Sequence, residues 1–159
     1  MTKLLLVSLL GIAACQAIDD IRYKPKVGPL QPDAAVNGEC PVIPGDTCGD
    51  SDLTVEVSFS HDIQPLIKRP TGGCMTHTMM LAPNISLDLS TYATLRKGGL
   101  ISGERIIVNC RPCDSLLVHK LADPVQPAGL LRMPNNGPYW SNAEMTLLRD
   151  WIAEGARDN

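Results

Sequence analysis

Two pairs of residues in this sequence have types and spacing that suit chemistry. The stretch CMTH holds Cys74 and His77 three residues apart, and Cys110 and Cys113 form a second close pair. Three thiolates and one imidazole would make a closed tetrahedral zinc site of the structural kind. Alternatively, Cys74 forms a disulfide with Cys110 or Cys113, and the third cysteine stays free or pairs between molecules. The spacing alone leaves both arrangements open.

The first residues of the chain predict export. MTKLLLVSLLGIAAC has one positive charge, a short apolar run and small residues before Cys15, which is typical of a secretory signal and too short to span a bilayer. Its end resembles the bacterial lipobox, which implies that residues 1–14 are removed and that Cys15 is acylated. An ordinary signal peptide cut near Ala17 is the alternative. Because Gln16 rather than aspartate follows Cys15, the resemblance implies anchoring at the outer membrane, with the protein facing the periplasm.

A tether is expected over residues 15–52, because this stretch is rich in Pro and Gly and has no sustained apolar period. Within it, Cys40 and Cys48 enclose seven residues. Since an exported protein meets an oxidising space, a local disulfide between these two cysteines is the simplest expectation.

Residues 53–159 read as one mostly helical domain with long loops between short helices. Apart from a strand-like alternation over Leu53 to Phe59, the apolar residues recur at helical spacing, and each helix has its own start and stop signals. The expected starts are Ser60, Ser90, Asp114 and Ser141, the last in a capping box with Glu144, and the expected stops are Pro70, Gly98, Pro124 and Gly155.

Composition excludes several function classes. The net charge is -3 with mixed signs, so no positive field is present to hold a nucleic acid. Neither a phosphate-cradling glycine loop, a Ser/His/Asp arrangement nor a close carboxylate pair stands out, so a hydrolase has little support. Long loops in a small helical domain usually serve a function, which suggests that something holds them.

Taken in order, several blocks of this domain resemble the planctomycete-type cytochrome c domains of bacterial lipoproteins. The resemblance covers Val57 to Ala156, and the blocks are VSFSHDIQPLI, GGCMTH, LDLSTYATLRKGG, CDSLLVHKL and RMPNNGPYWSNAEMTLLRDWIAEGA. It implies a small all-α fold with crossing first and last helices and a haem held between loops.

The same resemblance assigns roles to three residues. His77 matches the proximal iron ligand, Cys74 the first attachment cysteine and Met133 the distal ligand, an arrangement suited to electron transfer. Members of the family usually have C-x-x-C-H, whereas this chain lacks the second cysteine, so haem c would be bound through at most one thioether, from Cys74. Residues three apart on a helical turn still share a face. With Cys74 on haem, Cys110 and Cys113 are left as a disulfide pair.

The resulting prediction is a haem-binding electron-transfer lipoprotein with an unidentified redox partner protein and a lipid anchor in the membrane. Since electron transfer turns over no substrate, we do not expect an enzyme. The alternative is a cytochrome-like lipoprotein without haem, serving in binding or structure, and stabilised by disulfides or by the Cys3His zinc site.

Overall fold

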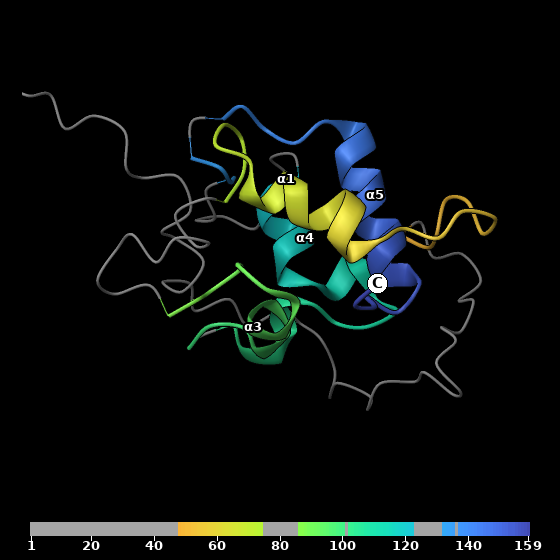
Figure 1. Cartoon of the computed structure of the whole chain (residues 1–159), viewed down its shortest axis with the longest axis horizontal. Helices are drawn as coiled ribbons and strands as arrows, with labels where there is room; N and C mark the ends of the chain where they lie inside the picture. Colours follow the sequence, from red (N-terminus) through yellow and green to blue (C-terminus); the bar gives the residue numbers. More distant parts are fainter. Residues whose placement is uncertain (1–47, 75–85, 101, 123–131, 136) are drawn as a thin grey trace, which may run out of the picture.

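The computed structural model describes residues 48–74, 86–100, 102–122, 132–135 and 137–159 (Figure 1). Within these ranges the chain forms helices and no strands, so the described part is all-α as expected. None of these helices is long and apolar enough to cross a membrane. The signal sequence, most of the tether, Cys15, Cys40 and His77 lie outside the described residues.

The first helical segment starts earlier than predicted. A π-helical turn, η1 (Phe59–Ile63), runs directly into α1 (Gln64–Lys68). Ser58 rather than Ser60 is the N-cap, because its hydroxyl accepts a hydrogen bond from the backbone N–H of His61 at 3.2 Å. The Asp62 carboxylate in turn accepts from the N–H of Ser58 at 2.8 Å. Residues 53–59 form no strand, so the strand-like pattern over Leu53 to Phe59 was a wrong indication.

The next helix, α3 (Tyr92–Lys97), has its N-cap one residue later than expected. Thr91 is the N-cap, and it forms a capping box with Thr94. The predicted stop at Gly98 is confirmed, since Gly98 has a φ of 69°. A Cβ there would lie 1.8 Å from the carbonyl oxygen of Gly103, at the start of the 3-10 turn η2 (Gly103–Ile106). Glycine is thus required both by the backbone conformation and by the lack of space.

The third predicted helix forms, but Asp114 does not cap it. Asp114 ends a separate 3-10 turn, η3 (Pro112–Asp114), and α4 (Leu116–Leu121) starts after Ser115. The Ser115 hydroxyl is used elsewhere, accepting from the N–H of Val108 at 2.9 Å. That hydrogen bond fixes the loop before η3 against the start of α4.

The last helix, α5 (Asn142–Ala153), confirms the sequence prediction in detail. Ser141 accepts from the N–H of Glu144, and the Glu144 carboxylate accepts from the N–H of Ser141 at 2.7 Å. This reciprocal capping satisfies two N–H groups that a helix start leaves without partners. The apolar face of α5 is buried in the core, and its members are Met145, Leu148, Trp151 and Ile152.

The core joins the first and last helical segments. Phe59, Tyr92 and Trp151 meet with ring centroids 5.3 to 6.5 Å apart, so η1, α3 and α5 share one aromatic cluster. The Trp151 Nε1 donates to the carbonyl of Arg157 at 2.9 Å, and the Asn159 side chain accepts from the N–H of Phe59 at 2.8 Å. Figure 1 shows α1 and α5 side by side, with the C-terminus close to the start of η1.

Candidate functional site

Cys74 is buried directly after the first helical segment. Cys74 is 1% exposed, and its thiol is reduced. The backbone N–H of Cys74 donates to the carbonyl of Ile67 at 2.8 Å, so the end of α1 fixes its position. Of the two residues that the stretch CMTH contributes to the predicted site, this is the one that the structure describes.

Met133 is buried as well, at 2% exposure. Its backbone N–H donates to the carbonyl of Lys120 in α4 at 2.8 Å. The preceding Arg132 donates from Nε to the carbonyl of Leu121 at 3.1 Å and stacks over the Tyr139 ring, 4.2 Å from its centroid. These contacts tie the Met133 segment to the last turn of α4.

A hydrogen bond connects the segments that carry Cys74 and Met133. The Trp140 Nε1 donates to the carbonyl oxygen of Gly72 at 2.9 Å. Gly72 has a φ of 75°, and a Cβ there would lie 2.8 Å from the carbonyl oxygen of Pro138. The two loops therefore touch at a point where only glycine fits.

An ion pair reinforces the same junction. Arg69, at the end of α1, pairs with Glu144 in the first turn of α5. Its guanidinium also lies 5.7 Å from the centroid of the Trp140 ring. Arg69 beside the Glu144 carboxylate holds the pKa of that group below its usual value. Trp140 and Arg69 are thus residues that position the site and that sequence reasoning did not single out.

The Cys74 and Met133 side chains belong to one apolar core cluster. A reduced thiol and a buried thioether in the same apolar surroundings fit the donor chemistry that a c-type haem requires, namely a sulfur for attachment and a sulfur for iron. The third predicted donor, His77, lies outside the described residues. The structure thus describes two of the three residues that the resemblance proposes as haem contacts, and both are buried.

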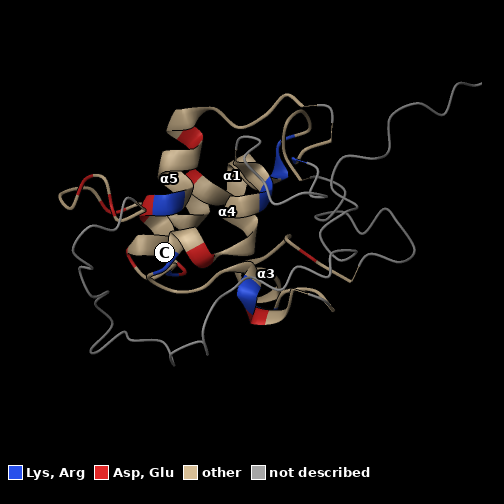
Figure 2. Cartoon of the chain, turned by 180° about the vertical axis from the view of Figure 1, so that it is seen from behind, with Lys and Arg blue, Asp and Glu red and all other residues tan. Residues whose placement is uncertain are grey.

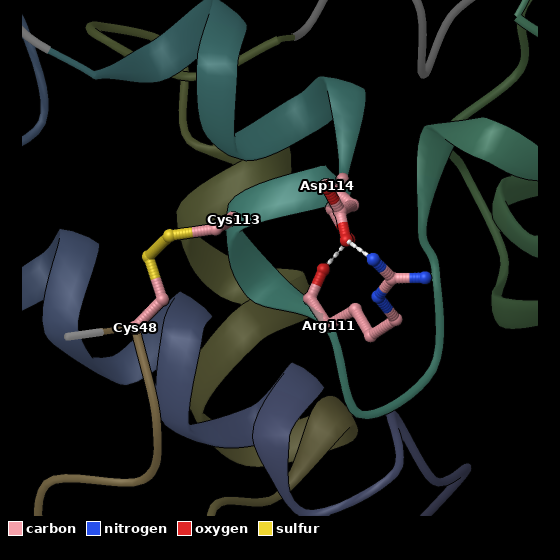
Figure 3. Close-up of a disulfide and its surroundings, with 5 residues drawn as sticks. Cys48, Arg111, Cys113 and Asp114 are labelled. Atoms are coloured by element: carbon pink, nitrogen blue, oxygen red, sulfur yellow. Dashed lines mark hydrogen bonds and ion pairs between the residues drawn. A yellow bond between two sulfur atoms is a disulfide. The ribbon is translucent and has the colours of Figure 1, made fainter. Parts of the chain in front are cut away.

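The disulfide pairing differs from both predictions. Cys48 is bonded to Cys113, with Cα atoms 5.7 Å apart and 65 residues of separation (Figure 3). Cys110 is also disulfide-bonded. The expected pairs Cys40 with Cys48 and Cys110 with Cys113 were therefore wrong. The fold brings Cys48 to the η3 turn, and this long-range proximity cannot be read from sequence spacing.

The same bonds exclude the Cys3His zinc arrangement in this structure. A cysteine binds zinc as a thiolate, whereas the sulfurs of Cys110 and Cys113 are both consumed in disulfides. Among the described residues, no group of three or more His, Cys, Asp or Glu side chains is placed to hold a metal ion.

The segment that follows Cys48 is held against α5 by carboxylates. The backbone N–H and hydroxyl of Ser51 donate to Asp150 at 2.9 and 2.6 Å, and the N–H of Val57 donates to Glu154 at 2.9 Å. Burial raises the pKa of Glu154, and the negative charges of Asp50, Glu56 and Asp150 raise it further. Figure 2 shows acidic residues both on this segment and on α5.

Comparisons of the chain with known protein families, with curated proteins and with solved structures gave no match. The described residues of the domain are all-α and contain a disulfide, with a reduced cysteine and a methionine in a shared core.

Proposed function

We propose that this protein is a haem-binding electron-transfer lipoprotein of the bacterial cell envelope. The observation that carries the proposal is the Trp140 to Gly72 hydrogen bond, which joins the segment of Met133 to that of Cys74. Two segments about sixty residues apart in the chain thereby bring the two sulfur donors into one apolar core. Short helices joined by long loops, as the resemblance implies, would hold a haem in this way.

In this proposal Cys74 forms the thioether, and His77 and Met133 are the axial ligands. When bound, haem supplies one-electron exchange at the iron, and no substrate is turned over. The chain's own contribution is to fix the donors. Cys74 is held by the Ile67 carbonyl and Met133 by the Lys120 carbonyl, so both sulfurs stay in surroundings that exclude water.

The proposed anchor is an acylated Cys15 at the outer membrane, followed by the tether over residues 15–52. The Cys48 to Cys113 disulfide fastens the end of this tether to the η3 turn. The domain would then exchange electrons with a redox partner protein while the lipid keeps it at the membrane surface.

Expression in a bacterial envelope that has a c-type maturation system tests the proposal. We expect a Soret band and a haem mass that remains on the chain after denaturation. His77→Ala should abolish the band, and Cys74→Ser should leave no covalent adduct. Met133→Leu should keep the covalent mass but shift the spectrum, because the distal sulfur is lost.

Matched controls separate ligand loss from damage to the fold. His61→Ala removes an exposed histidine, and Met145→Leu removes a methionine that is 3% exposed on α5. Both controls should retain the wild-type spectrum. A colourless wild-type protein without an adduct would refute the proposal.

The Cys48 to Cys113 bond favours a second candidate, a haem-less binding or structural lipoprotein with the same fold. Because the disulfides rather than a cofactor would stabilise that protein, it would be colourless, fully folded and destabilised by reduction. The same purification distinguishes it from the first candidate.

A further inference from the structure

Two apolar side chains close together in the sequence are exposed near the start of the described domain. Leu53 is 79% exposed and Val55 is 58% exposed. The other large apolar side chains exposed in the described part of the chain, Leu100 and Tyr139, lie in two different segments. Scattered exposed apolar residues are ordinary on a protein surface, whereas adjoining ones form a patch of the kind that marks interaction sites. The segment that carries Leu53 and Val55 is therefore a candidate interaction surface.

This segment, residues 49–56, is here named the acidic loop, and hydrogen bonds hold its exposed turn in shape. The N–H of Val55 donates to the carbonyl of Asp52 at 3.1 Å, which closes a turn around Leu53 and Thr54. The Asp52 carboxylate accepts from the N–H and the hydroxyl of Thr54 at 3.0 and 2.6 Å. Because polar contacts maintain the turn, its apolar side chains remain available to another molecule.

Both ends of the acidic loop are fixed to the domain. Directly before it, Cys48 is bonded to Cys113 in η3. Directly after it, the N–H of Val57 donates to the Glu154 carboxylate of α5 at 2.9 Å. Figure 1 shows the loop in orange, projecting from the helical body. A projecting loop that is already ordered loses little conformational entropy when a partner binds.

The charge of the acidic loop indicates which partner it fits. The loop contains no lysine or arginine and three acidic residues, namely Asp50, Asp52 and Glu56. Hydrogen bonds from the hydroxyl and the N–H of Thr54 hold the pKa of Asp52 below its usual value, so this carboxylate is ionised at neutral pH. Arg157 pairs with Glu56 at 3.4 Å, but both side chains are more than half exposed, so the pair is weak. The loop therefore presents a net negative charge around its apolar patch.

The same charge argues against three other occupants of this surface. Anionic lipid headgroups repel carboxylates. A second copy of the chain carries a formal net charge of -3 and the same acidic loop. The chain's own residues 16–47 contain five acidic and three basic residues, so they too are net acidic. A separate basic protein has the complementary charge.

We propose that the acidic loop docks a separate protein whose surface carries an apolar pocket bordered by lysine and arginine side chains. Leu53 and Val55 enter the pocket, and their burial supplies affinity. The surrounding carboxylates face the basic border, where they speed association and select the partner. This role is independent of haem binding and goes beyond the proposed electron transfer.

Photo-crosslinking of the full chain in its native host cells tests the proposal. A p-benzoylphenylalanine in place of Val55 keeps an apolar group in the loop and, on illumination, links it to a molecule in contact. We expect one prominent protein adduct, with the linked peptide at an apolar surface pocket beside lysine or arginine residues. An adduct with lipid, with residues 16–47, with a second copy of the chain or with a site that lacks basic residues would overturn the proposal. The absence of any adduct would overturn it as well.

Titration of the purified, linked protein with variants of the chain gives the second test. Leu53→Ser should weaken binding at least about tenfold, because the apolar contact is lost. Asp52→Asn keeps an oxygen that accepts from Thr54 but removes the charge, so association should slow about threefold at low ionic strength and less at high ionic strength.

Leu100→Ser is the matched control, because Leu100 is 88% exposed and lies outside the acidic loop. This variant should bind as tightly as the wild type. All three substitutions alter exposed side chains, so the core of the domain is unchanged. Equal losses of affinity at Leu53 and Leu100, or an association rate that depends neither on salt nor on the Asp52 charge, would contradict the proposal.

Discussion

Replacing Trp140 by phenylalanine removes the hydrogen bond that joins the two segments of the candidate site. The ring stays apolar, but the Nε1–H that donates to the Gly72 carbonyl at 2.9 Å is lost. The Gly72 oxygen keeps a weaker partner in Arg69, whose Nη2 lies 3.3 Å away. A buried hydrogen bond of this kind contributes about 1 kcal/mol to stability. We therefore expect a loss of about that size, with a further contribution from the volume removed.

Trp151→Phe is the matched control. Trp151 is also buried, and its Nε1 donates to a backbone carbonyl, that of Arg157, at the same distance of 2.9 Å. Both variants should lower the free energy of unfolding in urea by similar amounts. Only Trp140→Phe, however, should loosen the contact that covers the segment of Cys74.

The buried thiol of Cys74 reports this local loosening. In protein made without c-type maturation, a thiol reagent labels Cys74 only when its surroundings open. Lowering the opening free energy by about 1 kcal/mol speeds labelling about fivefold. Peptide mass spectrometry in the absence of denaturant identifies Cys74 as the labelled site.

Equal acceleration of Cys74 labelling in both tryptophan variants, or an unchanged labelling rate in Trp140→Phe, would contradict this prediction. In the first case the thiol reports global unfolding, and in the second the Trp140 to Gly72 contact does not control access to the site.

Two further predictions concern α5 and the α3 stop. The pKa of Glu154 is raised in the folded protein, so its ionisation opposes folding; this cost is absent below the unfolded pKa and complete above the folded one. The Glu154→Gln variant should therefore be more stable than the wild type at neutral pH, and this gain should disappear as the pH falls toward 4.5. Urea titrations at several pH values measure the difference. A gain in stability that does not depend on pH would contradict the prediction. Gly98→Ala should lower the free energy of unfolding by about 3 kcal/mol or more, since the added Cβ would collide with the Gly103 carbonyl. A Cβ added at Gly103 would meet no atom within 4 Å, so Gly103→Ala should lower it by only about 1 kcal/mol in the same denaturation assay. Equal costs at the two glycines would show that backbone conformation alone, and not the collision, decides.

Local signals in the sequence predicted those parts of the fold that local interactions determine. The Ser141 and Glu144 capping box and the left-handed Gly98 depend only on residues within one turn, and both are present. The first helical segment starts at Phe59 instead of after Ser60, because Phe59 packs on Trp151. These two residues lie near opposite ends of the domain sequence. A cap motif alone does not contain that information.

The sequence indicated two residues of the candidate site, but not the residues that hold their segments in place. Cys74 and Met133 were singled out from their sequence context, and both lie in the core. Trp140 donates to the Gly72 carbonyl, and Arg69 pairs with the Glu144 carboxylate. Both partners are far away in the sequence, so no spacing rule predicts these contacts. The predicted disulfide pairs were wrong for the same reason. Cysteines close in the sequence looked like natural pairs, whereas the folded chain brings Cys48 to Cys113.

The placement of the two tryptophans gives the protein a pair of built-in optical probes. The sequence contains only Trp140 and Trp151, one at the junction of the candidate site and one in the aromatic cluster beside the C-terminus. Each phenylalanine variant therefore leaves a single fluorophore. Emission from Trp140 alone would follow events at the Cys74 and Met133 segments, including quenching by a bound chromophore. Emission from Trp151 alone would follow separation of the first and last helical segments.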